Sequence, residues 1–464
     1  MNKSMAVWLV LWGVGCAHAP KSAGDAETKP TADTGALSAR AEASYAALDF
    51  AACAEQFRES AGPCADDDCR ATAFYRAAGC AALGGDASQA MGLLTRAADS
   101  GYLDLDHLRF NPELASLHAH ADWSAVVARV EANRQKQPDL QPQGMPIATL
   151  GGIDVYGSRR VDAEAVRRLL GYELGKPAVP SKALFRLTER ALREKYNLAL
   201  AKVAYVYFFA GEDQGRAYVT VDLVDAEDSH RLRFLSTPSG HPEDPEGLVT
   251  RWRAYEDRAI QLARSGALNP SEPRCRVTHC AIGFGHPELE PLETYFVEKV
   301  PAAVEALTRV LREESDAESR AAAAFLLAYA ATPEQTVERL VPFIRDPDGS
   351  VRNNVLRVLL ATQEKAEAPL MDVAVVVDAL SLPETADRNK SLFLLQMLLK
   401  DLKPDALKAQ QASLIRQFGP WLVELTSLHQ PINREPAVEL LTLLAGKELQ
   451  TPEQWKAWLA QQPK

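Results

Sequence analysis

Four segments in the last third of this chain begin alike, and this recurrence limits the fold more than any other feature of the sequence. Each starts with an arginine followed by a largely apolar run, and the arginines are 32, 36 and 46 residues apart: Arg320, Arg352, Arg388 and Arg434. Helical units that recur at intervals of roughly 20–50 residues bury their apolar faces by stacking on their neighbours. The recurrence therefore predicts an array of stacked helices.

The segment before Arg352 reads Asp346-Pro347-Asp348-Gly349-Ser350-Val351. It resembles HEAT repeats, whose turn carries an aspartate and whose second helix opens with Val-Arg. The resemblance implies a C-terminal α-solenoid over residues 298–464, with a concave binding surface and no chemistry of its own. We expect each arginine to bind acids or carbonyl groups of the adjacent turn and so to set how the repeats stack. Arg434 departs most from the pattern, because Glu435-Pro436 follows it.

A second recurrence lies near the N-terminus. Phe50-x2-Cys53-x3-Phe57-x2-Ser60 aligns with Ala87-x2-Ala90-x3-Leu94-x2-Ala97 at an offset of 37 residues, and each segment follows an aspartate. The spacing places small, large and small residues on one helix face, which lets a neighbouring helix approach closely. This resembles tetratricopeptide repeats and implies a helical module over residues 37–134. That family's period is about 34 residues, so the extra residues fall in the loop between Cys64 and Cys69.

The first residues read as a signal peptide. Lys3 precedes an apolar run over residues 5–14, which is too short to span a bilayer. The run ends Gly13-Val14-Gly15-Cys16, which resembles the lipobox of bacterial lipoproteins, with Gly13 where that family usually has leucine. The resemblance implies a signal peptide over 1–15, a lipid on Cys16 and a polar tether over 16–36. The alternative is an ordinary cleaved secretion signal.

Lipidation of Cys16 would leave six of the seven cysteines, an even number that favours disulfides in an exported protein. Cys64 and Cys69 are five residues apart, as are Cys275 and Cys280, so each pair can close a small loop. Cys53 and Cys80 remain, and the repeat resemblance implies that they lie on adjacent packed helices. The alternative for this last pair is two small buried residues with free thiols.

The period of the apolar residues changes after a linker rich in proline and glutamine, residues 135–146. The region 147–228 predicts a strand, two helices and a β-hairpin, a βααββ order. With Gly157 after the first strand, Gly175 after the first helix and Tyr196 closing the second helix, the region resembles a POTRA (polypeptide-transport-associated) domain. The resemblance implies a binding module that can add an extended peptide to a sheet edge. The alternative is a domain of this topology that only packs.

A connector over residues 229–297 contains Cys275, His279, Cys280 and His286. Two cysteines and two histidines could hold zinc, but the spacing does not fit the common Cys-x2-Cys pattern. Export favours a Cys275–Cys280 disulfide instead. Metal binding and free thiols remain as alternatives.

The net charge of the 464-residue chain is −11, which argues against nucleic acid as a partner, since phosphate contacts need clustered cations. The sequence contains no nucleophile elbow, no His-Glu-x-x-His motif, no phosphate loop with lysine and no dinucleotide fingerprint. The predicted fold is multidomain and mainly α, with a small α+β domain between helical repeats.

These features lead to one expectation of function: a non-enzymatic scaffold or adaptor in the bacterial cell envelope, without cofactor or metal. Its partners would be envelope proteins or peptides, and a lipid anchor would hold it in the membrane. Because Ala17 offers no Asp-type retention signal, the outer membrane is favoured, with the protein facing the periplasm. The alternatives are an enzyme or metal-dependent protein with its site around Cys275, His279, Cys280 and His286, and a soluble secreted binding protein.

Overall fold

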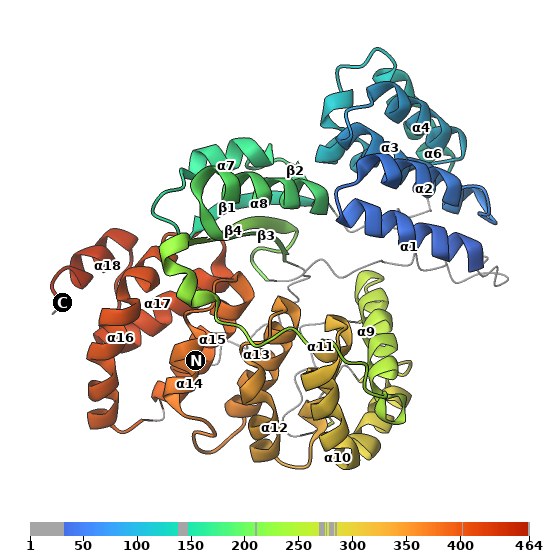
Figure 1. Ribbon diagram of the computed structural model, residues 1–464. Coiled ribbons are helices and arrows are strands. Elements are labelled where there is room, and N and C mark those ends of the chain that lie inside the picture. Colours follow the sequence, from blue (N-terminus) through green and yellow to red (C-terminus); the bar gives the residue numbers. More distant parts are fainter. Residues whose placement is uncertain are drawn as a thin grey trace.

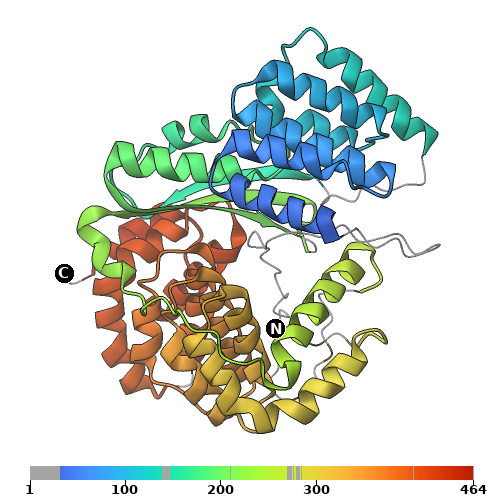
Figure 2. The ribbon, with the colours of Figure 1, turned by 45° about the vertical axis from the view of Figure 1, so that its right-hand side comes forward.

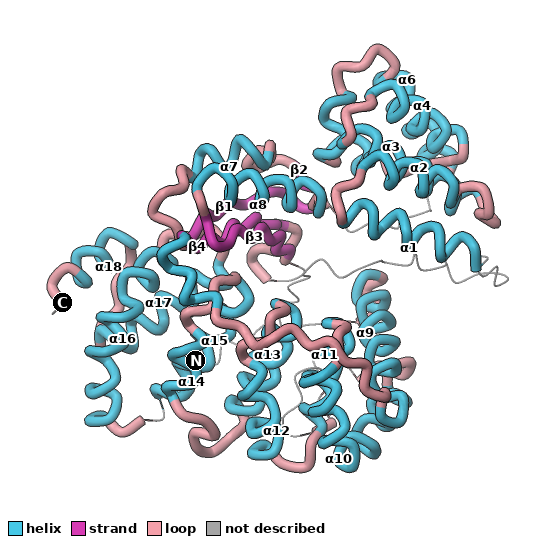
Figure 3. The backbone as a smooth tube through the Cα atoms, in the orientation of Figure 1, coloured by secondary structure: helices cyan, strands magenta, loops and turns pink. Residues whose placement is uncertain are grey.

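A computed structural model describes residues 32–137, 147–208, 211–268, 274, 276–277, 283, 285–400 and 402–462. This part of the chain is mainly helical, with one small four-stranded sheet (Figures 1 and 3). Cys16, the signal peptide, Cys275, His279 and Cys280 lie outside it. None of the helices described combines the length and apolar character needed to cross a bilayer.

The N-terminal part is a bundle of short helices packed around an alanine-rich core. Asp49 and Asp86, the aspartates before the two aligned segments, accept hydrogen bonds from backbone amides at the starts of their helices, which satisfies donors that lack a partner within the helix. The first helix begins at Ala32, inside the range expected to be tether. The elements are α1 (Ala32–Ala46), α2 (Phe50–Ser60), α3 (Asp67–Leu83), α4 (Ala87–Asp99), α5 (Leu105–Phe110), η1 (Pro112–Leu117) and α6 (Trp123–Lys136).

Both cysteine pairs expected in this bundle are present as disulfides. Cys53 on α2 is bonded to Cys80 on α3, and these two helices pack against each other. Cys64 is bonded to Cys69 across the loop that joins them. Both pairs therefore lie at bonding distance, as the disulfide expectation requires.

The sheet has the strand order β2-β1-β4-β3, with β1 parallel to β4 and β3 antiparallel to β4. Its elements are β1 (Ala148–Tyr156), α7 (Ala163–Leu170), β2 (Pro177–Ala178), α8 (Lys182–Tyr196), β3 (Leu198–Tyr207) and β4 (Arg216–Asp225). The predicted order of two helices between the first strand and the hairpin is confirmed, and the short edge strand β2 is an addition. Gly157 ends β1 at a φ of 93°, and a Cβ there would lie 2.4 Å from the carbonyl oxygen of Leu223, so this turn requires glycine.

The two faces of the sheet have different neighbours. Helices α7 and α8 cover one face, and the last helices of the chain lie against the other (Figure 2). Tyr156 at the end of β1 belongs to the same apolar core as those C-terminal helices. The sheet is therefore a layer between two sets of helices.

Helices α11, α13, α15 and α17 pack side by side in chain order. One continuous core extends from Leu248 on α9 to Trp458 on α18, so α9, which lies within the connector range 229–297, packs as part of this array. The elements are α9 (Leu248–Arg264), α10 (Glu290–Glu313), α11 (Ala317–Leu326), η4 (Leu327–Tyr329), α12 (Pro333–Leu340), η5 (Val341–Phe343), α13 (Gly349–Glu364), α14 (Val373–Ala379), α15 (Thr385–Lys400), α16 (Pro404–Leu425), α17 (Pro431–Ala445) and α18 (Pro452–Leu459).

The segment that leaves the sheet crosses the helical array in the reverse direction. It passes through η2 (Ala226–Leu232) and η3 (Pro245–Gly247) and makes contacts with the loops between helices on its way to α9 (Figure 1). The side chain of Arg231 donates to the carbonyl of Ser381, the amide of Leu235 to that of Arg345, and the amide of Gly240 to that of Glu313. We call residues 231–244 the strap.

The two disulfides are expected to stabilise the fold unequally. Cys53 and Cys80 are 27 residues apart, whereas Cys64 and Cys69 are five apart, and a longer closed loop removes more entropy from the unfolded chain. Replacing Cys53 and Cys80 by alanine should lower the free energy of unfolding by about 3 kcal/mol, and replacing Cys64 and Cys69 by about 2 kcal/mol. Urea unfolding of the two double variants measures the difference, and the reverse order would contradict the loop-length argument.

Candidate functional site

The four arginines singled out in the sequence occupy the same place in four helices. Each is the fourth residue of its helix. From there the guanidinium turns back and donates to carbonyl groups of the loop that leads into the helix. These carbonyls belong to Glu314 and Ser315, to Asp346 and Pro347, to Pro383, and to Leu428 and His429. Each arginine therefore fixes the entry into its own helix.

Two of these arginines also bind carboxylates that come later in the array. Arg320 holds Asp346 with two hydrogen bonds of 3.1 and 2.9 Å, and both side chains are 2% exposed. The Nη2 atom of Arg352 lies 3.0 Å from Asp387 and 2.8 Å from Glu384. A paired buried charge stabilises its surroundings only when both partners are present. These pairs connect α11 to the loop before α13, and α13 to the start of α15.

The third arginine finds its carboxylate in the sheet. The Nη2 atom of Arg388 donates to Oδ1 of Asp222 on β4 at 2.5 Å, between residues 166 positions apart. The other oxygen of Asp222 accepts hydrogen bonds from the amide and the hydroxyl of Thr385, the first residue of α15, at 2.7 and 2.9 Å. The guanidinium of Arg388 also lies 4.3 Å from the ring centre of Tyr156, a cation–π contact. Arg388 thus takes its acid from the sheet, whereas Arg320 and Arg352 take theirs from the helical array.

The neighbouring strand brings a second aspartate to the next helix. Asp154 on β1 accepts hydrogen bonds from the amides of His429 and Gln430, both at 2.9 Å, and its Oδ1 lies 2.7 Å from the ring Nδ1 of His429. Gln430 is the N-cap of α17, where the helix dipole favours a negative charge. A Cβ at residue 152 would lie 2.4 Å from that of His429, so Gly152 permits this close approach.

A separate joint connects the N-terminal bundle to the sheet domain. The hydroxyls of Tyr45 and Ser181 both donate to Oε1 of Glu113, at 2.5 and 2.7 Å. The amide of Ala183 in α8 donates in turn to the hydroxyl of Tyr45 at 3.1 Å. Burial and the Glu113 charge raise the pKa of Tyr45 well above its usual value, so this hydroxyl stays protonated as a donor. Polar side chains from three separate segments therefore satisfy one another's hydrogen bonds.

Burial changes the ionisation of the charged groups between the sheet and the array. Burial raises the pKa of Glu384 to about 7, with a contribution from Asp387 and against the opposing effect of Arg352. The guanidinium of Arg352 thus faces two acidic side chains, Glu384 and Asp387. Oε2 of Glu384 accepts no hydrogen bond within the described residues. Burial lowers the pKa of Arg388, but the charge of Asp222 outweighs it and the net shift is upward, so Arg388 stays charged.

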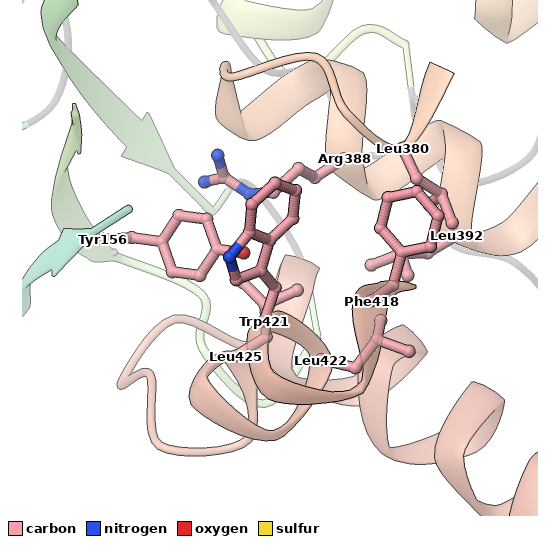
Figure 4. A pocket seen from close by; sticks show the side chains of 8 residues that line it. All are labelled: Tyr156, Leu380, Arg388, Leu392, Phe418, Trp421, Leu422 and Leu425. Carbon is pink, nitrogen blue, oxygen red and sulfur yellow. The ribbon is translucent and has the colours of Figure 1, made fainter. Parts of the chain in front are cut away.

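The cavity in this region is too small for a ligand. Figure 4 shows Tyr156, Trp421 and Arg388 close together on one side of it. Its volume is about 10 Å³, roughly the space for one water molecule. A larger hollow of about 310 Å³ lies where the strap meets the array, lined by Arg233, Phe234, Leu235, Arg345 and Asp378. We call the buried charged contacts of Asp154, Asp222, Arg352, Glu384 and Arg388 the sheet–helix junction.

The sequence singled out a second region, around residues 275–286, and only part of it can be described. His286 lies before α10, where its Nδ1 accepts a hydrogen bond from the amide of Glu288 at 3.2 Å and its carbonyl accepts from Leu289 and Glu290. It therefore organises the start of that helix. No group of three or more His, Cys, Asp or Glu side chains is placed to hold a metal within the described residues.

Sequence reasoning missed the two aspartates of the sheet. Asp154 and Asp222 are 4% and 0% exposed, and each interrupts an apolar strand, in Ile153-Asp154-Val155 and Val221-Asp222-Leu223. A charged residue inside a strand that is otherwise apolar predicts a buried partner. That signal was available, but it does not say which arginine the partner is.

Removing Asp222 is expected to destabilise the protein strongly, because Arg388 would remain buried without its carboxylate. Asp222→Ala should lower the free energy of unfolding by about 3–5 kcal/mol, and the double variant Asp222→Ala/Arg388→Met should recover much of that loss. Urea unfolding measures both. The control is Glu227→Ala, which breaks a surface pair with Arg160 and should cost less than about 1 kcal/mol. Equal costs for Asp222→Ala and Glu227→Ala would contradict the prediction.

Glu384 is expected to make stability depend on pH. Its carboxyl ionises near pH 4.5 in the unfolded chain but stays protonated up to about pH 7 in the folded protein. Its contribution is therefore fully present below pH 4.5 and is lost as the pH rises to about 7. Glu384→Gln removes the excess negative charge and keeps an acceptor for Arg352, so it should raise stability at pH 8 by about 1–3 kcal/mol.

Thermal unfolding of wild type and Glu384→Gln between pH 4 and 8 tests this, with the exposed Glu367→Gln as a control. A wild-type profile parallel to that of Glu384→Gln would show that folding does not raise the pKa of this carboxyl and would contradict the prediction.

Comparison with known proteins gives no match to a family model, to a curated protein or to a solved structure. The function of this chain must therefore be argued from its own residues and geometry.

Proposed function

We propose that this chain is a non-enzymatic lipoprotein of the bacterial cell envelope, anchored through Cys16, that acts as a scaffold or adaptor between envelope proteins. The observation that carries the proposal is the use made of its buried and half-buried carboxylates. Asp154, Asp222 and Glu113 each bind groups from distant parts of the chain. Such contacts join segments into one body, and these carboxylates already have partners within the chain instead of facing a substrate.

The helical parts support the same proposal. The repeated arginines and the disulfide-linked N-terminal helices fit the resemblance to HEAT and tetratricopeptide repeats, which present surfaces to other proteins. The side-by-side packing of α11, α13, α15 and α17 is the geometry that such repeats require. The outer membrane, with the protein facing the periplasm, remains the favoured location.

The sheet supports an extended peptide as the kind of partner. The POTRA resemblance implies that an extended peptide can be added to an exposed edge of the sheet, and the two edge strands are β2 and β3. The face of the sheet from which Tyr156 and Asp222 make their contacts is already packed on the helical array. A partner that binds the sheet is therefore expected at an edge and not on that face.

Two measurements on the intact protein test the proposal. Cells grown with a labelled fatty acid should incorporate label into wild type and lose it in Cys16→Ser, because only the thiol can carry the lipid. The lipidated protein, purified from membranes after cross-linking, should retain the same envelope proteins reproducibly.

Three outcomes would contradict the proposal. Label retained in Cys16→Ser would remove the anchor. Stoichiometric zinc in the purified protein would favour the alternative site at Cys275, His279, Cys280 and His286. A cross-linked sample that retains no envelope protein would remove the adaptor role.

A further inference from the structure

The helical layer on the outer side of the sheet is basic, although the chain as a whole is acidic. Residues 159–196 contain ten lysines and arginines against five aspartates and glutamates, whereas the whole chain contains 51 against 62. This range includes α7 and α8, which cover the sheet face opposite the helical array (Figure 2). We call the outward side of residues 159–196 the basic face.

The cations of the basic face point to solvent because the apolar side chains of the same helices point to the sheet. Val166 and Leu170 of α7, and Phe185 and Leu192 of α8, belong to the core that these helices share with the strands. Residues on the other side of each helix therefore face outward. Nine of the ten basic residues are exposed: Arg159, Arg160, Arg168, Lys176, Lys182, Arg186, Arg190, Arg193 and Lys195.

The acids near these cations bind them only weakly. Arg168 lies 3.8 Å from Asp162, but both side chains are more than 60% exposed, and exposed ion pairs contribute little. Arg190 and Arg193, which are three positions apart on α8, form no ion pair with a residue that the structure describes. These charges are therefore available to an anionic partner.

Two exposed leucines lie among the cations. Leu169, in the last turn of α7, is 42% exposed, and Leu174, in the segment after it, is 53% exposed. Each is close to a cation in the sequence, since Arg168 precedes Leu169 and Lys176 follows two positions after Leu174. On a lipid surface, leucines that project from a cationic layer enter the boundary between headgroups and acyl chains, while the cations contact anionic headgroups. The basic face offers both kinds of contact.

We propose that the basic face docks on the surface of an anionic phospholipid membrane. The inference rests on the proposed function in one respect, namely that the chain is held at a membrane, and it adds which side of the protein meets that membrane. Cys16 and Ala32, where α1 begins, are 16 positions apart, so the chain between them reaches at most about 55 Å. α1 ends beside α8, where Arg186 donates to the carbonyl of Ala46. An anchor at Cys16 therefore leaves the basic face within reach of the same bilayer.

Binding to vesicles of defined composition tests the proposal. The protein is the full chain with Cys16→Ser, which carries no lipid, and the vesicles are phosphatidylcholine alone or an equal mixture of phosphatidylcholine and phosphatidylglycerol. The apolar run over residues 5–14 is common to all variants and meets both kinds of vesicle, so the ratio of the two affinities reports the charged surface. Sedimentation with the vesicles measures both affinities.

The chain offers a matched control for the arginines of the basic face. In the Cys16→Ser protein, Arg190→Gln/Arg193→Gln removes two exposed arginines from α8, and Arg309→Gln/Arg312→Gln removes two exposed arginines with the same spacing from α10. The two double variants have the same net charge. A third variant, Leu169→Ser/Leu174→Ser, removes the exposed leucines and keeps every charge.

The Cys16→Ser protein should bind anionic vesicles at least about 25-fold more tightly than neutral ones, because each cation near an anionic surface strengthens binding about fivefold. Arg190→Gln/Arg193→Gln should bind the anionic vesicles about 25-fold more weakly, and the α10 variant should bind them as the parent does. Leu169→Ser/Leu174→Ser should bind them about tenfold more weakly, because it loses apolar contact with the acyl region. Thermal unfolding should be the same in all four proteins, since the replaced side chains are exposed.

Equal binding to the two kinds of vesicle would overturn the proposal. Equal losses in the two arginine variants would overturn it as well, because net charge alone would then explain the binding. Unchanged binding of Leu169→Ser/Leu174→Ser would also overturn it, since a face that recognises only charge fits an acidic protein or polymer and not a membrane. The test uses neither lipidated protein nor envelope proteins, so failure of the docking face and failure of the proposed function are distinguishable.

Discussion

The ion pair between Arg388 and Asp222 is the contact on which the arrangement of this molecule most depends. Both side chains are nearly excluded from water, at 4% and 1% exposure. A buried charge without its partner is strongly unfavourable, so the sheet and the helical array each carry a group that requires the other. The pair also stands at the start of α15, where Asp222 bonds to Thr385. Separation of the sheet from the array would break this ion pair and remove Asp222 as the acceptor for the amide and hydroxyl of Thr385 at the start of α15.

This pair belongs to a rule that runs through the array. Each repeated arginine fixes its own entry loop through carbonyl groups. Arg320 takes its acid from the loop before α13, and Arg352 takes its acids from the start of α15. At Arg388 the acid comes from β4, while Asp154 of β1 bonds to the amides that begin α17. Because β1 and β4 are adjacent and parallel, their aspartates reach α17 and α15, two helices that pack side by side. Near the end of the array, the sheet thus supplies the carboxylates that the array itself supplies nearer its beginning.

The sequence predicts local features of this fold well and contacts between distant segments poorly. Asp49 and Asp86 could be placed at helix starts because a cap acts within a few residues, and the arginines could be recognised because they recur. The partner of Arg388 lies 166 residues away, and no local pattern distinguishes Asp222 from any other acid. The same holds for Tyr45 and Ser181, whose common acceptor Glu113 lies in a third segment. Burial creates these pairs, and burial is known only once the fold is known.

The reverse course of the strap follows from the position of the sheet. The sheet is bound at α15 and α17, near the end of the array, whereas the chain must next form α9 at the other end of the same core. The intervening segment has to run along the array, and its polar groups need partners on the way. The loops at Ser381 and Arg345 and the C-terminal residue of α10, Glu313, supply these partners. The strap and the sheet–helix junction therefore make residues 147–462 interdependent, and we expect them to fold together and not as separate domains.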